Sequence, residues 1–184
     1  GTTYGLNQID RNTMKIKKYT MNDGLTNNNI KSLLFSEEYL WIGTQDGLNI
    51  LDIKNDEIID ITDYLKRAGV KDKCIQEIYR DKDGVYWLGN FIAGSLIKIN
   101  IDDRFIKVYH VCNYETEQEI ANIKCISEYN DILWIGTSEG LVKFNKRKET
   151  YEQYTDKDGL SNNNVYGILI DSKDDLWMST NNGL

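Results

Sequence analysis

The residue types that carry most enzyme chemistry are sparse in this sequence. His110 is the only histidine, so any Ser-His-Asp or Cys-His arrangement would depend on it. It stands at the end of a predicted strand where related segments have threonine, which favours a structural role. No glycine-rich loop of the P-loop type occurs. These observations argue against an enzyme.

Metal-binding patterns fail as well. Cys74, Cys112 and Cys125 have no CxxC spacing, which argues against zinc, and we interpret them as small buried or loop thiols. The tetrapeptide DKDG occurs at 81–84 and at 156–159, but a calcium loop needs Gly and Glu where Tyr86 and Ile92 stand. We predict no metal and no cofactor, and we interpret both tetrapeptides as turns before a strand.

The charged residues exclude several other classes. The carboxylate pairs at 37–38 and 174–175 are adjacent on predicted turns, whereas glycosidases need two carboxylates that face one pocket. The net charge of −7 argues against binding to nucleic acid or to an anionic membrane. The basic run at 146–148 is followed at once by Glu149, so we interpret it as a solvated turn. No segment reaches the ~18 apolar residues that would insert into a membrane.

The elements that would position any site are repeated. All four tryptophans lie in one recurring motif, W-[IL]-G or close variants of it followed by Gly-Leu, at spacings of 43 to 47 residues. Strand-like runs lie before and after each motif, with Asp-Gly turn signals between them. The one helix candidate is short, from Ile61 to Ala68. Four short strands every ~40–45 residues are the signature of a β-propeller blade. The tryptophans are predicted to pack between blades: Trp41, Trp87, Trp134 and Trp177.

We therefore predict an all-β fold, a β-propeller of four-stranded antiparallel blades. The chain is interpreted as a single fragment over 1–184, of about four blades, with three whole units and two complementary halves. The predicted units are 1–20 (outer half), 30–62, 75–110, 123–155 and 165–184 (inner half). The two halves predict either a ring closed within one molecule or a homodimer that completes each blade between two copies.

Crossovers between units supply the candidate ligand residues. The stretch DGLTNNN at 23–29 recurs as DGLSNNN at 158–164, between the last strand of one unit and the first strand of the next. A ligand would bind at the mouth of the central channel, near the starts of the innermost strands. The side chains expected there are mostly amides, although stabilisation of turns by these asparagines is the favoured alternative. The candidates are Asn28, Asn29, Lys73, Asn122, Asn163 and Asn164.

The motifs resemble the two-component regulator propeller repeat. The segments "YTMNDGLTNNNIKSLLFSEEYLWIGTQDGLNIL" and "YTDKDGLSNNNVYGILIDSKDDLWMSTNNGL" carry the pattern best, whereas the second unit departs from it with "WLGNFIAGSL". The resemblance implies propellers that form the extracytoplasmic part of membrane-anchored bacterial histidine kinases, hybrid two-component proteins or related receptors.

The resemblance also implies a function. We expect a non-catalytic signal-input module that binds a small molecule or a carbohydrate and passes the signal to a cytoplasmic output domain. A protein-interaction or dimerisation platform is the alternative, and a propeller enzyme would need clustered His, Arg or acidic residues at the channel.

Overall fold

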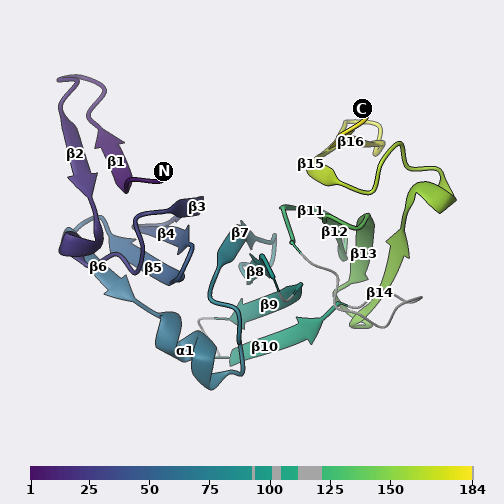
Figure 1. Cartoon of the computed structure of the whole chain (residues 1–184), viewed down its shortest axis with the longest axis horizontal. Helices are drawn as coiled ribbons and strands as arrows, with labels where there is room; N and C mark the ends of the chain where they lie inside the picture. The colour runs from purple at the N-terminus through teal and green to yellow at the C-terminus, as the bar shows by residue number, and fades with distance from the viewer. Residues whose placement is uncertain (93, 101–104, 112–121, 184) are drawn as a thin grey trace. The chain divides into compact units, whose positions relative to one another are not determined.

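The computed structural model describes residues 1–92, 94–100, 105–111 and 122–183 (Figure 1). Cys112 lies outside these residues, as does most of the crossover after the second unit. Within the described residues the regular secondary structure consists almost entirely of antiparallel strands, so the prediction of an all-β fold is confirmed. It divides into two compact units, residues 1–78 and 79–184.

Unit one holds a hairpin and a four-stranded sheet, each with strands paired in chain order. The short helix α1 (Thr62–Arg67) follows the sheet, where the sequence predicted a helix of one or two turns. Its core joins Leu6 and Tyr19 of the hairpin to Ile42 and Leu51 of the sheet. The strands are β1 (Leu6–Ile9), β2 (Ile16–Tyr19), β3 (Ile30–Ser36), β4 (Tyr39–Thr44), β5 (Gly47–Asp52) and β6 (Glu57–Asp60).

Two further four-stranded sheets and a second hairpin follow. The first of these sheets begins with β7, which crosses the boundary at residue 78, and the others belong to unit two. The strands are β7 (Ile75–Arg80), β8 (Tyr86–Asn90), β9 (Ser95–Asn100), β10 (Phe105–His110), β11 (Cys125–Tyr129), β12 (Ile132–Gly136), β13 (Leu141–Asn145), β14 (Thr150–Tyr154), β15 (Val165–Ile170) and β16 (Leu176–Thr180). Among the described residues, no helix has the length and apolar character needed to cross a membrane.

The glycine two residues after each of the first three motif tryptophans allows the next sheet to approach closely. A Cβ on Gly89 would lie 2.3 Å from Ile123 Cγ2, and one on Gly136 would lie 2.8 Å from Val165 Cγ1. Both distances are shorter than real carbon–carbon contacts, so only glycine fits at these two positions without a shift of the neighbouring residues. The backbone NH groups of Ile123 and Val165 also donate to carbonyls at the end of the preceding sheet, Asn90 O at 3.1 Å and Thr137 O at 2.9 Å. Successive sheets are thus joined by packing and by hydrogen bonds.

In the last hairpin the glycine of this pair lies on the first strand instead of the second. Ser32 pairs with Gly43 in unit one and Cys125 with Gly136 in unit two, so the second strand supplies the glycine. In the last hairpin Gly167 of β15 pairs instead with Ser179 of β16. Each pair keeps one residue without a side chain, which conserves the volume between the strands.

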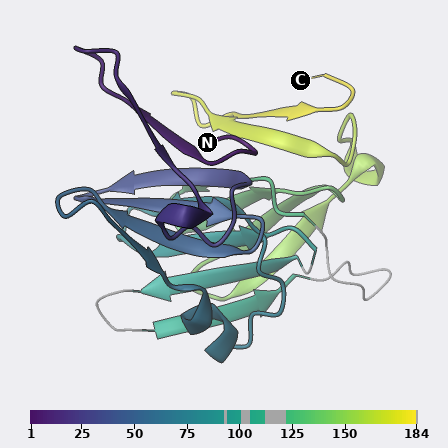
Figure 2. The ribbon, with the colours of Figure 1, turned by 60° about the vertical axis from the view of Figure 1, so that its left-hand side comes forward.

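The two DKDG tetrapeptides adopt different structures. At 81–84 the prediction of a turn before a strand is correct, because Asp81 Oδ1 accepts from the backbone NH of Asp83 at 3.0 Å and of Val85 at 2.9 Å before β8. At 156–159 the prediction is wrong. There residues Asp156–Asp158 form the 3₁₀-helix η2, which lies between β14 and β15 and ends at Gly159 with φ 105° (Figure 2). The residue before the tetrapeptide makes the difference, since Thr155 caps the helix.

Candidate functional site

The first crossover is held by its own polar side chains. Thr20 and Asp23 form a capping box around the 3₁₀-helix η1 (Met21–Asp23), and Gly24 ends it with φ 108°. Asn28 Oδ1 accepts from the backbone NH of Met21 at 2.9 Å. The amide of Asn28 therefore stabilises this turn.

The crossover between β14 and β15, which is the second one with the DGL-[ST]-NNN sequence and is called the second crossover, repeats these interactions. Thr155 and Asp158 form the capping box. Asn163 accepts from the backbone NH of Asp156 at 2.6 Å, and its Nδ2 donates to the carboxylate of the same residue at 2.9 Å. Asn28 and Asn163, both predicted as ligand residues, thus have the turn-stabilising role that was the favoured alternative.

A buried asparagine that was not among the predicted site residues anchors the first crossover. Asn49, on β5, accepts from the backbone NH of Thr26 at 3.0 Å and from its hydroxyl at 2.8 Å. The hydroxyl of Thr26 also contacts that of Thr44 at 2.9 Å. The sequence carried a signal for this role, because Asn49 is the one amide in the otherwise apolar run of β5, GLNIL.

A cluster of interacting side chains comes from the residue before β11, from the end of the second crossover and from the start of β15. Lys124 donates to Asn164 Oδ1, and its ammonium lies 4.0 Å from the centroid of the Tyr166 ring, a cation–π contact. Asn164 Nδ2 in turn lies 3.2 Å from the Tyr166 hydroxyl. Burial lowers the pKa of Lys124, and nearby Cys125 opposes this shift. We call Lys124, Asn164 and Tyr166 the crossover cluster. The sequence predicted Asn164 but missed the other two.

The remaining predicted ligand residues differ in their surroundings. Asn122 directly precedes Ile123, has φ 60°, and its buried Oδ1 has no hydrogen-bond partner within the described part of the chain. Asn29 is half-buried, and its backbone NH donates to Asn27 Oδ1 at 2.7 Å. Lys73 is exposed in unit one, on the segment between α1 and β7. The structure brings Asn122 and Asn164 into one unit, on the segments that lead into β11 and β15.

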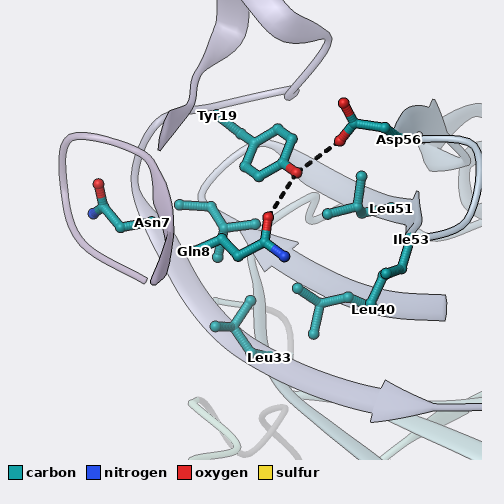
Figure 3. A pocket seen from close by; sticks show the side chains of 9 residues that line it. Asn7, Gln8, Tyr19, Leu33, Leu40, Leu51, Ile53 and Asp56 are labelled. Atoms are coloured by element: carbon teal, nitrogen blue, oxygen red, sulfur yellow. Dashed lines mark hydrogen bonds between the residues drawn. The ribbon is translucent and has the colours of Figure 1, made fainter. Parts of the chain in front are cut away.

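Unit one contains a cavity of about 300 Å³ between the β1–β2 hairpin and the β3–β6 sheet (Figure 3). Leu33, Leu40 and Leu51 form much of its apolar lining. At its polar edge the Tyr19 hydroxyl lies 2.8 Å from Asp56 Oδ1 and 3.1 Å from Gln8 Oε1 (Figure 3). We call this cavity the slot.

The polar edge of the slot is a repeated arrangement. Lys17 forms an ion pair with Asp56, and this hydrogen bond lowers the pKa of the carboxyl. In unit two, Tyr109 donates to Glu149 Oε1 at 2.7 Å and Lys107 pairs with the same carboxylate. In each case the outer strand of one repeat carries a lysine and a tyrosine two residues apart. Both side chains bind a carboxylate that lies in the outer turn of the next repeat.

A second cluster, in unit two, contains three carboxylates. Lys146 Nζ lies 2.9 Å from Asp81, 3.0 Å from Asp83 and 2.5 Å from Glu128. Burial alone would lower the pKa of Lys146, but hydrogen bonds to Glu128, Asp81 and Asp83 raise it overall. The carboxylates are close enough together to hold a metal ion, yet the ammonium of Lys146 already lies among them and offsets part of their charge. This cluster is therefore described as an ion-pair network.

An aspartate six residues before a tryptophan orients the indole in two repeats. Trp87 Nε1 donates to Asp81 Oδ2 at 2.8 Å, and Trp177 Nε1 donates to Asp171 Oδ2 at 2.9 Å. The repeated motif predicts the tryptophans but not these partners, although the D-x₅-W spacing is visible in both segments. Trp87 packs in a core with Ile123 of the following repeat.

Comparison with known proteins gives a consistent picture. Residues 159–182 match the family model "Two component regulator propeller". The chain is 29% identical over 174 residues to "Histidine kinase P4" of Formosa agariphila, an alignment that covers 87% of this chain and 12% of that protein. The chain thus spans about an eighth of the length of this relative.

Solved structures share the fold. The extracellular domain of BT4673 of B. thetaiotaomicron, described as a one component system, matches with TM-score 0.79 and 21% identity over 100% of this chain and 25% of that one. That of BT3049 of the same organism, described as a hybrid two component system, matches with TM-score 0.73 and 23% identity over 97% and 23%. Virginiamycin B lyase from Staphylococcus aureus matches with TM-score 0.70 and 16% identity over 96% and 56%. At such identities these likenesses establish the fold and nothing more. Residues 159–182 therefore match the two-component regulator propeller repeat, and the chain has a β-propeller fold.

Proposed function

We propose that the chain is a non-catalytic sensor module in the extracytoplasmic part of a membrane-anchored two-component-type receptor. In this proposal it binds a small molecule or a glycan and passes the signal to a cytoplasmic output domain. The observation that carries the proposal is the similarity to a histidine kinase over 87% of the chain. The fold shared with extracellular domains of signalling systems supports it.

We place the ligand at the crossover cluster. Tyr166 is an exposed aromatic ring on which a sugar or another flat apolar face can stack. Asn164 and Lys124 supply hydrogen-bond groups beside that ring. Asn122, two residues before Lys124 in the sequence, has a buried Oδ1 that would gain a partner from a ligand that donates a hydrogen bond.

The one histidine supports a role without catalysis. Among the matched folds is a lyase, so the fold itself accommodates enzymes. In this chain His110 is exposed and lies at the end of the outer strand β10, opposite Ser95. It is on the outermost strand of its sheet, whereas the crossover cluster lies at the start of innermost strands.

The proposal is tested by a thermal-shift screen of the intact chain against neutral oligosaccharides, acidic oligosaccharides and small metabolites. We expect at least one of them to raise the melting temperature of the wild type. Tyr166→Ala and Lys124→Met are expected to lose the shift. Tyr129→Ala, which removes an exposed ring outside the cluster, is expected to keep it. A shift of equal size in all four proteins would refute this location.

A protein-interaction platform is the second candidate, and the exposed apolar side chains at the end of unit two favour it. Leu169 and Trp177 lie opposite each other on β15 and β16, and both are exposed. A chain that binds partner proteins or copies of itself, but nothing in the ligand screen, would favour this reading.

A further inference from the structure

Three repeats close the turn after their second strand in the same way. A threonine at the end of that strand donates its hydroxyl to the carbonyl of the glycine three residues on, after β4, β12 and β16. The two residues between them are polar in every case. The hydrogen bonds are Thr44 Oγ1 to Gly47 O at 3.0 Å, Thr137 Oγ1 to Gly140 O at 2.8 Å and Thr180 Oγ1 to Gly183 O at 3.1 Å. These three turns are therefore short and polar.

The turn after β8 departs from this structure. Asn90 replaces the threonine, and the turn is two residues longer, because Leu96 follows its tryptophan by nine positions whereas Leu48 follows by seven. The strand pairing supports this alignment, since each leucine pairs with the glycine two residues after its tryptophan. The longer turn carries Phe91 and Ile92, which are 41% and 67% exposed. Apolar side chains are thus exposed where the other turns are polar.

This turn lies beside the start of β11. The carbonyl of Asn90 accepts from the backbone NH of Ile123 at 3.1 Å, and the side chain of Ile123 is buried. Phe91 directly follows Asn90, and Asn122 directly precedes Ile123. Phe91 and Asn122 therefore flank one hydrogen bond between the end of β8 and the residue that leads into β11, both in unit two.

Asn122 contributes an unused acceptor. Its Oδ1 is buried and has no hydrogen-bond partner among the residues that the structure describes. Its φ of 60° lies in the left-handed region, which asparagine adopts more readily than most other residues. Buried polar atoms are normally hydrogen-bonded, so this oxygen is suited to a donor from a bound molecule.

The next repeat shows the opposite combination. There the backbone NH of Val165 donates to Thr137 O at 2.9 Å, in the equivalent hydrogen bond. Asn164 directly precedes Val165, and its Oδ1 accepts from Lys124. The adjacent turn, after β12, is short and polar. An exposed apolar turn thus lies beside the amide that has no partner, and a polar turn lies beside the amide that has one. This is the combination expected where an aromatic ring and an amide bind one molecule.

We propose that Phe91 contacts the ligand, and that the part of the ligand bound there is a flat apolar face with a hydroxyl at its edge. The face packs on the Phe91 ring, and the hydroxyl donates to Asn122 Oδ1. Pyranose sugars and phenols share this chemistry. The inference rests on the proposed sensor function. It extends the site from the crossover cluster to the β8–β9 turn, because Asn122 lies only two residues before Lys124.

Small probes test this inference. The isotope-labelled intact chain is titrated with phenol and with methyl β-D-glucopyranoside, and chemical shifts report binding at the Phe91 ring and at the Asn122 side-chain amide. At least one probe is expected to shift both groups, and the one that does so distinguishes a phenolic ligand from a sugar. Anisole and the fully O-methylated glucoside keep the rings but lack the donors, so each is expected to bind more weakly than its parent probe.

Two variants separate the ring from the acceptor. Phe91→Ala is expected to weaken binding of the probe about fivefold. Phe105→Ala, at a similarly exposed position on the outer strand β10, is the matched control and is expected to bind like the wild type. Asn122→Gly accommodates the positive φ and removes the acceptor, so the probe and its methylated control are expected to bind to this variant equally.

Several results would overturn the inference. These are no shift at Phe91 and Asn122 with either probe, the same affinity in the two phenylalanine variants, and equal binding of probe and methylated control to the wild type. The sensor proposal is judged separately, by the thermal-shift screen. A compound whose thermal shift is lost with Tyr166→Ala but kept with Phe91→Ala would leave the sensor proposal standing and overturn this inference alone.

Discussion

Replacing Gly136 with alanine tests the way in which successive sheets interlock. The added methyl group would lie 2.5 Å from Cys125 Sγ, 2.8 Å from Val165 Cγ1 and 3.1 Å from Val165 O. Ordinary carbon contacts need about 3.5–4.0 Å, so β15 must move by roughly 1 Å relative to β12. Such a shift strains the hydrogen bond from Val165 NH to Thr137 O, now 2.9 Å.

The expected cost follows from two terms. Overpacking of a dense core costs about 1–3 kcal/mol, and weakening one backbone hydrogen bond adds about 1 kcal/mol. We expect Gly136→Ala to lower the free energy of unfolding by about 2–4 kcal/mol. For a chain of this size that corresponds to a fall in melting temperature of roughly 4–12 °C. Urea unfolding followed by tryptophan fluorescence measures it.

Gly167→Ala is the matched control. The same methyl group on β15 meets only Ser179 Oγ, at 3.1 Å, and a hydroxyl can rotate away. The control is expected to change stability by less than about 1 kcal/mol, because alanine also removes the entropic cost of glycine in a strand. Val165→Ala is expected to restore part of the stability of Gly136→Ala by making room for the methyl group. Equal losses for Gly136→Ala and Gly167→Ala would refute the interlocking argument.

Three further predictions concern buried polar groups. Burial raises the pKa of Glu77 to about 7 from 4.5, so the native state holds this proton more tightly than the unfolded chain does. The contribution of this proton to the free energy of unfolding is therefore complete below pH 4.5, and about 3 kcal/mol of it is lost as pH rises towards 7. Glu77→Gln should flatten this part of the stability–pH profile. An unchanged profile would contradict the burial of this carboxyl. Lys146→Met should cost about 3–5 kcal/mol at neutral pH, because Asp81 and Glu128, whose side chains are 1% and 6% exposed, lose their counter-ion. Lys148→Met, at the exposed neighbour two residues on, should cost almost nothing, and similar unfolding midpoints for the two would argue against the network. Asn49→Ala should cost about 1–3 kcal/mol and speed hydrogen exchange at the amide of Thr26, whereas unchanged exchange there would show that Asn49 does not anchor the crossover.

The strands could be predicted from the sequence because the same motif occurs in each repeat. Tryptophan, glycine and Gly-Leu recur at nearly constant spacing. A strand assigned wrongly in one repeat would therefore disagree with the aligned residues of the other repeats. The short helix was also visible, since α1 lies within the predicted Ile61–Ala68 segment. Repetition, more than local propensity, made these predictions secure.

The DKDG tetrapeptides show where local reading fails. Four identical residues form a turn before a strand at 81–84 and a 3₁₀-helix at 156–159. The difference comes from one neighbour, because Thr155 can cap a helix and Arg80 cannot. The signal T-x-x-D was present in both crossovers and would have distinguished the two cases.

The candidate site was predictable only in part, because amides serve turns and ligands equally well. Asn28 and Asn163 hydrogen-bond within their own crossovers, and no property of the isolated sequence separates them from Asn164. Lys124 directly precedes the innermost strand β11, and Tyr166 is the second residue of the innermost strand β15, 42 residues further along the chain. Their contact arises from packing of successive repeats, which a sequence position alone does not reveal.

The most direct test of the sensor account is a chemical-shift map of the isotope-labelled chain, titrated with the compound that gives the largest thermal shift. The account predicts perturbations centred on the side chains of Lys124 and Asn164 and on the ring of Tyr166, with saturation at a single affinity. Perturbations centred on the Lys146 network or the slot, with the crossover cluster unchanged, would contradict it.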